Sequence, residues 1–216
     1  MENIAISPTL SSRGIKISAA IISAKITNRR SGSLERFISS QIKEIDIAFL
    51  LHSDILRAYK IFYQNLDVVP PAEHLLRIIE RSGRLPNINN VIDCANTVSA
   101  SSLLSFGAHD IEKIKGNIRF DITQGNEQYI PLGKTEKEQI HVGEYACMDD
   151  EKILCRMDIK NCDETKVAKE TKQFILYAQG NEKTPEAYVQ KNLIAACDYI
   201  QQFCEGKYTI IQTIYS

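Results

Sequence analysis

The change of hydrophobic period near residue 117 constrains the fold more than any other feature of the chain. Before it, apolar residues recur every three or four positions, as in amphipathic helices. After it, apolar and polar residues alternate in short segments between Gly-Asn, Gly-Lys and Asp-Asp-Glu turns, as in half-buried strands. Helices grouped ahead of strands indicate an α+β fold rather than alternating α/β units.

The predicted helices have recognisable ends. Ser33 opens the first helical pattern, and Ser53 is suited to the N-cap of the second. Pro71 fits the first turn of the third helix, and Gly83 fits its C-terminal cap. The helices so predicted cover 33–45, 53–62, 72–83, part of 85–110, and a last helix that begins at Thr184-Pro185-Glu186 and stops at Gly206.

The predicted strands frame these helices at both ends of the chain. Residues 15–27 form a first strand, and the continuous apolar run 173–178 has the character of a buried strand. Residues 208–214 form a closing strand, a candidate partner of the first. The short period-two strands between them cover 117–122, 128–133, 140–149 and 152–159.

Composition narrows the class of function. Lys and Arg total 26 against 27 for Asp and Glu, so any contact with nucleic acid must be local. No apolar run reaches the roughly 20 residues that span a bilayer, so we expect no membrane segment. The six cysteines form no CxxC pair and are expected to be reduced thiols in a cytoplasmic protein. The four histidines are isolated from one another, so we expect no metal or cofactor.

The stretch from 85 to 110 combines an apolar helical stripe with polar groups. Asn90, Asp93 and Asn96 are interleaved with the stripe, and the run ends in a predicted turn that carries His109 and Asp110. Asp93 and Asn96 are three positions apart and share a helix face. Either these groups tie the helix to backbone nearby, or they line a pocket.

The same stretch resembles the B3/B4 domain of the phenylalanyl-tRNA synthetase β subunit. In that family a V-D-x-x-N helix precedes a Gly-turn with His and then I-x-G-x-I-x-x-R, which here are 92–96, 107–110 and "IKGNIRF" with Arg119. Similarity to free-standing B3/B4-like proteins continues through Gly143-Glu144, Cys155-Arg156, Asp163, Thr165 and Thr171. We expect one B3/B4-like domain over 1–216. Its parts are an N-terminal strand and helices (1–70), the best-matching core (71–180), and a C-terminal helix and strand (181–216).

The resemblance implies a fold and an activity. The fold is α+β: a three-layer domain with a β-sandwich flanked by helices. The activity is hydrolysis of a wrongly attached amino acid from tRNA, with the terminal adenosine helping to place water on the ester. The synthetase's catalytic, anticodon and coiled-coil parts have no counterpart here, so we expect no aminoacylating ligase. The implied partners are the acceptor end of tRNA or an amino-acid-like small molecule.

Three departures from the family pattern concern substrate choice. A Gly-Gly pair of the synthetase falls at Asn161 and Cys162. The Glu that recognises the tyrosine hydroxyl in the synthetase falls at Tyr177. The downstream T-D-A-S-x-R-F-E-R-G segment is replaced by a helix. A pocket without that carboxylate cannot satisfy a phenol in the same way, so the expected substrate amino acid is a different one.

Candidate site residues follow, each with an alternative. His109 either orients water as a proton shuttle or bonds backbone in a turn, and Asp110 caps the short turn 111–114. Arg119, Arg156 and Glu144 either converge on an anionic group or pair with each other and solvent. The polar loop with Asp158, Asn161, Asp163 and Thr165 is either an Asx-type turn or part of the site. The catalytic candidate is His109, and the substrate-binding candidates are Asn90, Asp93, Asn96, Arg119, Glu144, Arg156, Asn161, Thr165 and Tyr177.

Two classes of function remain open from sequence. The first is a stand-alone hydrolase of mischarged aminoacyl-tRNA. The second is a non-catalytic module that binds a tRNA end, an amino acid or a protein partner, and a weaker third is a hydrolase or sensor of an amino-acid-like metabolite. All of them require that the Asp93 helix edge, the His109 segment and the Asn161 region meet at one hollow.

Overall fold

The computed structural model describes residues 3–63 and 68–215, and it confirms the α+β class. Nine strands form one continuous sheet in the order β3-β8-β2-β9-β1-β4-β5-β6-β7. The strands are β1 (Asn3–Ile6), β2 (Lys16–Ser23), β3 (Ser105–Asp110), β4 (Ile118–Ile122), β5 (Tyr145–Met148), β6 (Ile153–Arg156), β7 (Lys160–Asn161), β8 (Gln173–Gly180) and β9 (Lys207–Tyr215). The helices are α1 (Pro8–Ser12), α2 (Gly32–Lys43), α3 (Ile47–Leu51), α4 (Asp54–Phe62), α5 (Pro71–Ser82), α6 (Asn90–Ser102) and α7 (Glu186–Phe203), with a 3₁₀ turn η1 (Ile111–Lys113).

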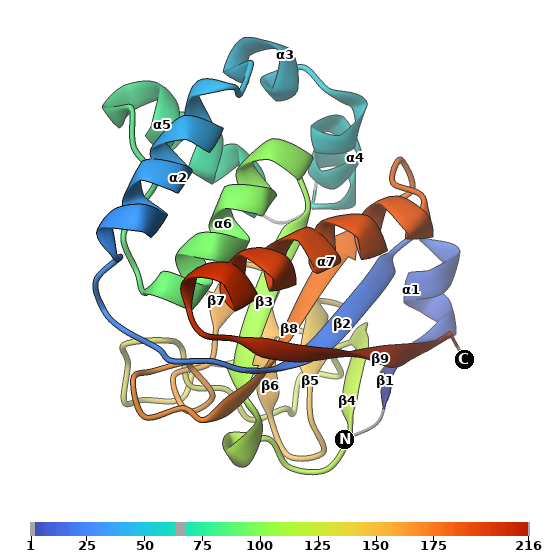
Figure 1. Ribbon diagram of the computed structural model, residues 1–216. Coiled ribbons are helices and arrows are strands. Elements are labelled where there is room, and N and C mark those ends of the chain that lie inside the picture. Colours follow the sequence, from blue (N-terminus) through green and yellow to red (C-terminus); the bar gives the residue numbers. More distant parts are fainter. Residues whose placement is uncertain (1–2, 64–67, 216) are drawn as a thin grey trace.

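Strand β9 joins the two halves of the sheet. Its first half pairs antiparallel with β2, where Ile211 lies opposite Ala19, so the predicted pairing of the closing strand with the first is confirmed. Its second half pairs in parallel with β1, where Ile214 lies opposite Ala5. One long strand therefore belongs to both halves (Figure 1).

Two apolar cores on opposite faces of β2 and β8 give the domain its layers. Because side chains alternate along a strand, Phe174 and Leu176 face the helices, whereas Ile175 and Tyr177 face the other half of the sheet. The helix-side core includes α2, α5, α6 and α7, and the sandwich core includes β1, β4, β5 and β6. The expected three layers, a β-sandwich flanked by helices, are confirmed.

Helix ends confirm three of the sequence signals and correct one. The Ser53 side chain accepts a hydrogen bond from the amide of Leu56, and Gly83 ends α5 in the left-handed conformation with φ 66°. Pro71 is the first residue of α5. For α2, the N-cap is Ser31 and not Ser33, because the Ser31 hydroxyl accepts the bond from the Leu34 amide. Both serines are competent caps, so sequence alone does not separate them.

The structure differs from the predicted strands and turns in several places. His109 and Asp110 end strand β3 rather than forming a turn, although Asp110 does cap η1 as predicted. Residues 128–133 form only isolated bridges, through Gln128 and Pro131. Strands β1 and β7 and helices α1 and α3 lie outside the predicted elements, because elements of two to five residues show too little periodicity. Among the described residues, no helix is long and apolar enough to cross a bilayer.

Gly107 packs under the ring of Tyr177 on the neighbouring strand. A Cβ at this position would lie 2.1 Å from Cζ of Tyr177 and 2.2 Å from its hydroxyl. We therefore predict that Gly107→Ala lowers the free energy of unfolding by about 1–3 kcal/mol, measured by urea titration, because the core must shift to admit a methyl group.

The matched control is Gly32→Ala at the start of α2, where the nearest atom to a new Cβ is Nη1 of Arg36 at 3.4 Å. This variant is expected to be near neutral. Combining Gly107→Ala with Tyr177→Leu should cost less than the sum of the single variants, since the two sites touch. Strict additivity would contradict the packing argument.

Candidate functional site

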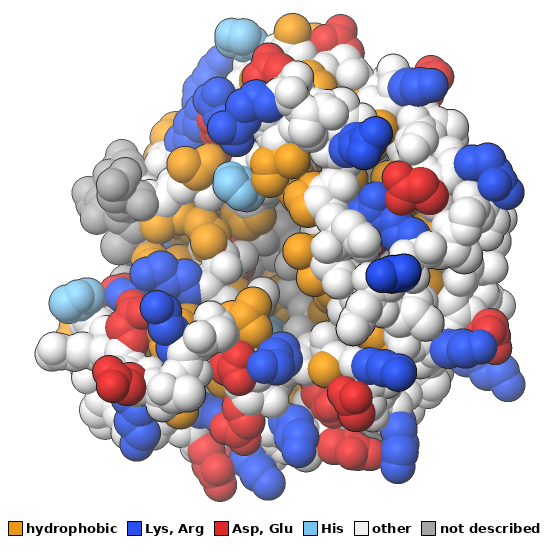
Figure 2. Space-filling model, turned by 90° about the vertical axis from the view of Figure 1, so that its left-hand side faces the viewer, with side chains coloured by type: hydrophobic (Ala, Val, Ile, Leu, Met, Phe, Trp, Pro, Cys, Tyr) orange, Lys and Arg blue, Asp and Glu red, His pale blue; other side chains and the backbone are white. Residues whose placement is uncertain are grey.

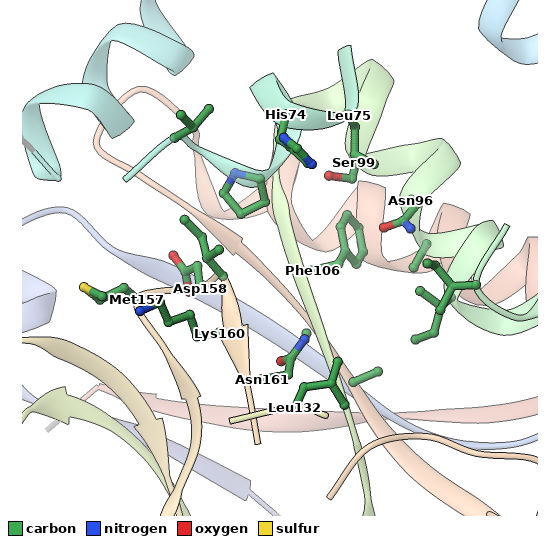
Figure 3. A pocket seen from close by; sticks show the side chains of 18 of the residues that line it. His74, Leu75, Asn96, Ser99, Phe106, Leu132, Met157, Asp158, Lys160 and Asn161 are labelled. Atoms are coloured by element: carbon green, nitrogen blue, oxygen red, sulfur yellow. The ribbon is translucent and has the colours of Figure 1, made fainter. Parts of the chain in front are cut away.

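The two edge strands of the sheet, β3 and β7, border a cavity of about 480 Å³. Helices α5 and α6 cover it from the side of the helix layer, and the turn 157–159 closes the opposite side (Figure 3). The cavity therefore forms where the two ends of the curved sheet come near each other.

The walls of the cavity are mainly apolar. Leu75 from α5, Ile92 and Ala95 from α6, and Phe106 and Leu176 from the sheet all line it. Its lining also includes large apolar side chains that are well exposed: Val69, Ile88, Leu132 and Ile159. Figure 2 shows this hollow with hydrophobic side chains along its wall. An apolar hollow with a few placed polar groups is typical of small-molecule sites.

Two amides face each other across this space. Asn96 lies on the α6 wall, and Asn161 lies on β7 (Figure 3). The Oδ1 atom of Asn161 is buried without a hydrogen-bond partner among the described residues. Because a buried acceptor left unpaired costs about 1–3 kcal/mol, this oxygen is suited to a donor on a ligand.

Asp158 is the acidic residue in the cavity lining. It follows Met157 in a turn in which both residues have left-handed backbone conformations, with φ 58° and 51°. Its Oδ2 accepts hydrogen bonds from the Tyr63 hydroxyl at 2.5 Å and from the Gln179 amide. Burial raises the pKa of Asp158 to about 7, against the lowering effect of these donors. A desolvated carboxyl in a cavity is the type of group found at functional sites.

His109 does not line the cavity. Along β3, Phe106 and Ala108 face the cavity, so the alternation of the strand turns His109 into the sandwich core. Its Nδ1 lies 3.0 Å from the Thr165 hydroxyl, and its ring stacks on Tyr177 with centroids 6.0 Å apart. Burial lowers the pKa of His109 to about 3. This placement gives no support to a proton shuttle at His109, and it places Thr165 and Tyr177 in the core as well.

Asp93 and Asn90 hold the N-terminal end of α6 in place. Asp93 is fully buried, pairs with Nε of Arg30 at 2.7 Å, and accepts a hydrogen bond from the Ile88 amide. Asn90 accepts from the Thr27 amide and donates to the Lys25 carbonyl. Asn90 and Asp93 therefore tie the helix to neighbouring segments and do not line a pocket, whereas Asn96 on the same helix faces the cavity.

The predicted charged candidates pair elsewhere. Arg156 and Glu144 form a buried ion pair, with Nη2 and Oε1 2.6 Å apart, and Arg156 also contacts Glu138. The Arg119 guanidinium donates to the carbonyl of Asp149. None of these side chains lines the cavity. Of the predicted residues, the structure brings only Asn96 and Asn161 together at it.

Asp158 and His74 are cavity residues that the sequence reasoning did not assign to the site. The sequence places Asp158 only within a polar loop that is either an Asx-type turn or part of the site. The residue that holds it, Tyr63, lies 95 positions away, so no local pattern marks the pair. His74 is an exposed residue of α5, and no sequence pattern on that face of the helix indicates a site.

The fold and the cavity together define an α+β domain with a ligand-sized hollow at the seam of its sheet. The chain belongs to the B3/4 domain family, which matches residues 55–205. The predicted resemblance is thereby confirmed.

One solved structure shows the same fold. It is the crystal structure of an N-terminal fragment of the phenylalanyl-tRNA synthetase β-subunit from Pyrococcus horikoshii. It is 15% identical, with a TM-score of 0.56, and the match covers 99% of this chain and 52% of that one. The chain thus spans about half the length of that fragment, and at this identity the likeness shows the fold alone. A search of curated proteins finds no match.

The two buried titratable groups predict opposite effects of acid on stability. His109 is neutral in the fold, whereas the unfolded chain takes up a proton as the pH falls through about 6.5, so stability is lost. Asp158 has its pKa raised, so the fold takes up a proton below pH 7 and stability is gained until the unfolded carboxyl titrates near about pH 3.9.

We therefore predict that His109→Asn reduces the loss of stability between pH 7 and 5, and that Asp158→Asn increases it, each by about 2 kcal/mol. The measurement is chemical denaturation at a series of pH values. Parallel curves for wild type and both variants would contradict the assigned protonation states.

Proposed function

We propose that this cavity binds the aminoacyl end of a mischarged aminoacyl-tRNA and that the chain hydrolyses the ester, with water as the nucleophile. The observation that carries the proposal is the pair of amides, Asn96 and Asn161, set in an apolar hollow with an unpartnered Asn161 oxygen. Membership of the B3/4 domain family supports a role connected with tRNA.

The cavity supplies the two requirements of such a reaction. Its apolar walls fit the side chain of an amino acid, and the amides offer donors and acceptors for the ester carbonyl and for water. Holding water near the ester and stabilising the developing oxyanion can each supply large rate factors without a protein nucleophile. The net charge of the whole chain is −1, so recognition of the tRNA body would rest on few contacts.

Substrate choice is proposed to differ from the removal of tyrosine. The position that corresponds to the tyrosine-recognising Glu is Tyr177, which lies in the sandwich core and does not line the cavity. The apolar residues Leu75, Phe106 and Leu176 favour an aliphatic or small aromatic side chain instead.

The test is deacylation of tRNAs charged with each amino acid in turn. We predict release from at least one apolar aminoacyl-tRNA, and a rate about 100-fold lower in Asn161→Ala, as expected when a positioning or oxyanion donor is removed. His109→Ala should retain the rate within a few fold. Asn117→Ala, which removes an exposed amide outside the cavity, is the matched control.

A binding module without catalysis is the second candidate. It is favoured by the position of His109, the predicted proton shuttle, outside the cavity. Binding of a charged tRNA with no release from any of the panel would establish this candidate and remove hydrolysis. Release that is unchanged in Asn161→Ala would place the reaction outside this cavity.

A further inference from the structure

Within the described residues, Asp158 and Asp110 are the two buried acids that have no positive partner, and only Asp158 lines the cavity. Four buried acids pair with a cation: Asp93 with Arg30, Glu144 with Arg156, Asp149 with Lys152, and Glu73 with Lys60 and Arg77. Asp110 lies at the N-terminus of η1, which it caps.

The partners of Asp158 are neutral. Its contacts are the Tyr63 hydroxyl and the Gln179 amide, and the Tyr145 hydroxyl also lowers its pKa. Arg156 and Lys160, the cations nearest in sequence, both pair with Glu138. A buried carboxylate that lacks a counter-ion is costly to ionise, so the fold holds a group that a bound cation would stabilise.

The carboxyl is also fixed in position. Met157 and Asp158 are the two central residues of the hairpin turn between β6 and β7, which the Ile159 amide closes on the Arg156 carbonyl at 3.2 Å, and both have the positive φ of a type I′ turn. Tyr63 from α4 and Gln179 from β8 fix the carboxyl from two elements. A carboxyl held by neutral partners in a cavity wall without a cation is better explained by a ligand than by stability.

We propose that Asp158 is the counter-ion for a protonated primary amine of the bound molecule, namely the α-ammonium of an aminoacyl group with an apolar side chain. This assignment rests on the proposed function, because it takes the aminoacyl group as the occupant of the cavity. Oδ2 already accepts from Tyr63 and Gln179, so the ammonium would meet Oδ1. Asn96 on α6 lies across the cavity from Asp158, and Asn161 lies on β7, three residues beyond Asp158 (Figure 3). These two amides would meet the carbonyl end of the aminoacyl group.

Six tyrosines and cysteines around Asp158 are neutral at neutral pH. Burial raises the pKa of each, and the negative charge of Asp158 adds to the increase: Tyr59 from α4, Tyr63 at its C-cap, Tyr145 and Cys147 from β5, Cys155 from β6 and Tyr177 from β8. None of them is a cation, and Lys160, which also lines the cavity, pairs with Glu138, so the ammonium would be the counter-charge of Asp158.

The experiment compares free amines with acylated ones, and it needs no tRNA. Calorimetry at pH 7.5 on the full chain would use leucinamide and phenylalaninamide, each beside its N-acetyl form. We expect the free amine to bind at least tenfold more tightly than the N-acetyl compound, and Asp158→Asn to abolish that difference. Glu164→Gln, which removes an exposed acid from the same segment, should keep it.

Equal affinity of the free and acetylated compounds, no binding of either amine at 10-millimolar concentration, or a preserved preference in Asp158→Asn would each overturn the assignment. If the chain releases no amino acid from any charged tRNA but still prefers the free amine, the hydrolase proposal is removed and the amine site stands.

A second measurement on the wild-type chain does not depend on a folded variant. At pH 6.5 Asp158 is partly protonated, and an ammonium beside it would lower its pKa and release a proton. The binding heat of leucinamide should therefore vary with the ionisation enthalpy of the buffer in the sense of proton release. Binding without proton release would overturn the proposal.

Discussion

The pairing of β9 with two different strands is the constraint on which the rest of this structure depends. Its first half is antiparallel to β2 and its second half is parallel to β1, so one backbone carries hydrogen bonds from one half-sheet into the other. The normal twist of strands then brings the far half over the face of β2 and β8, where the sandwich core forms. The free edges β3 and β7 come to border the same space, and the cavity occupies it.

In this arrangement the buried polar groups that hold the fold together differ from those in the cavity, which a ligand can reach. Buried charges such as Asp93 and Glu144 are satisfied by arginines within the fold, which is the condition for burying them. The cavity instead holds Asn161 with an unpartnered oxygen and Asp158 without a cation. Exposed edge strands are usually protected against pairing with other chains, and here α5, α6 and the 157–159 turn cover the space between them.

Much of the fold could be predicted from the sequence because local residue patterns determine where its main helices and strands form. The period change near 117, the caps at Ser53 and Gly83, and the run at 173–178 needed no knowledge of distant contacts. The site was harder, since a strand's period fixes which residues share a face but not which face meets the cavity. His109 and Ala108 are adjacent, yet only Ala108 lines it. Asp158 depends on Tyr63 and Gln179, whose approach only the folded chain reveals.

The most direct test of the central claim, that the space between β3 and β7 is the binding site, is a nuclear magnetic resonance titration. An aminoacyl-adenosine analogue with an amide in place of the ester would be added to the ¹⁵N-labelled chain. The account predicts that amide shifts change first around Asn96, Ala108 and Asn161. Shifts confined to the groove beside β9, around Glu186 and Gln212, with the cavity residues unmoved, would contradict it.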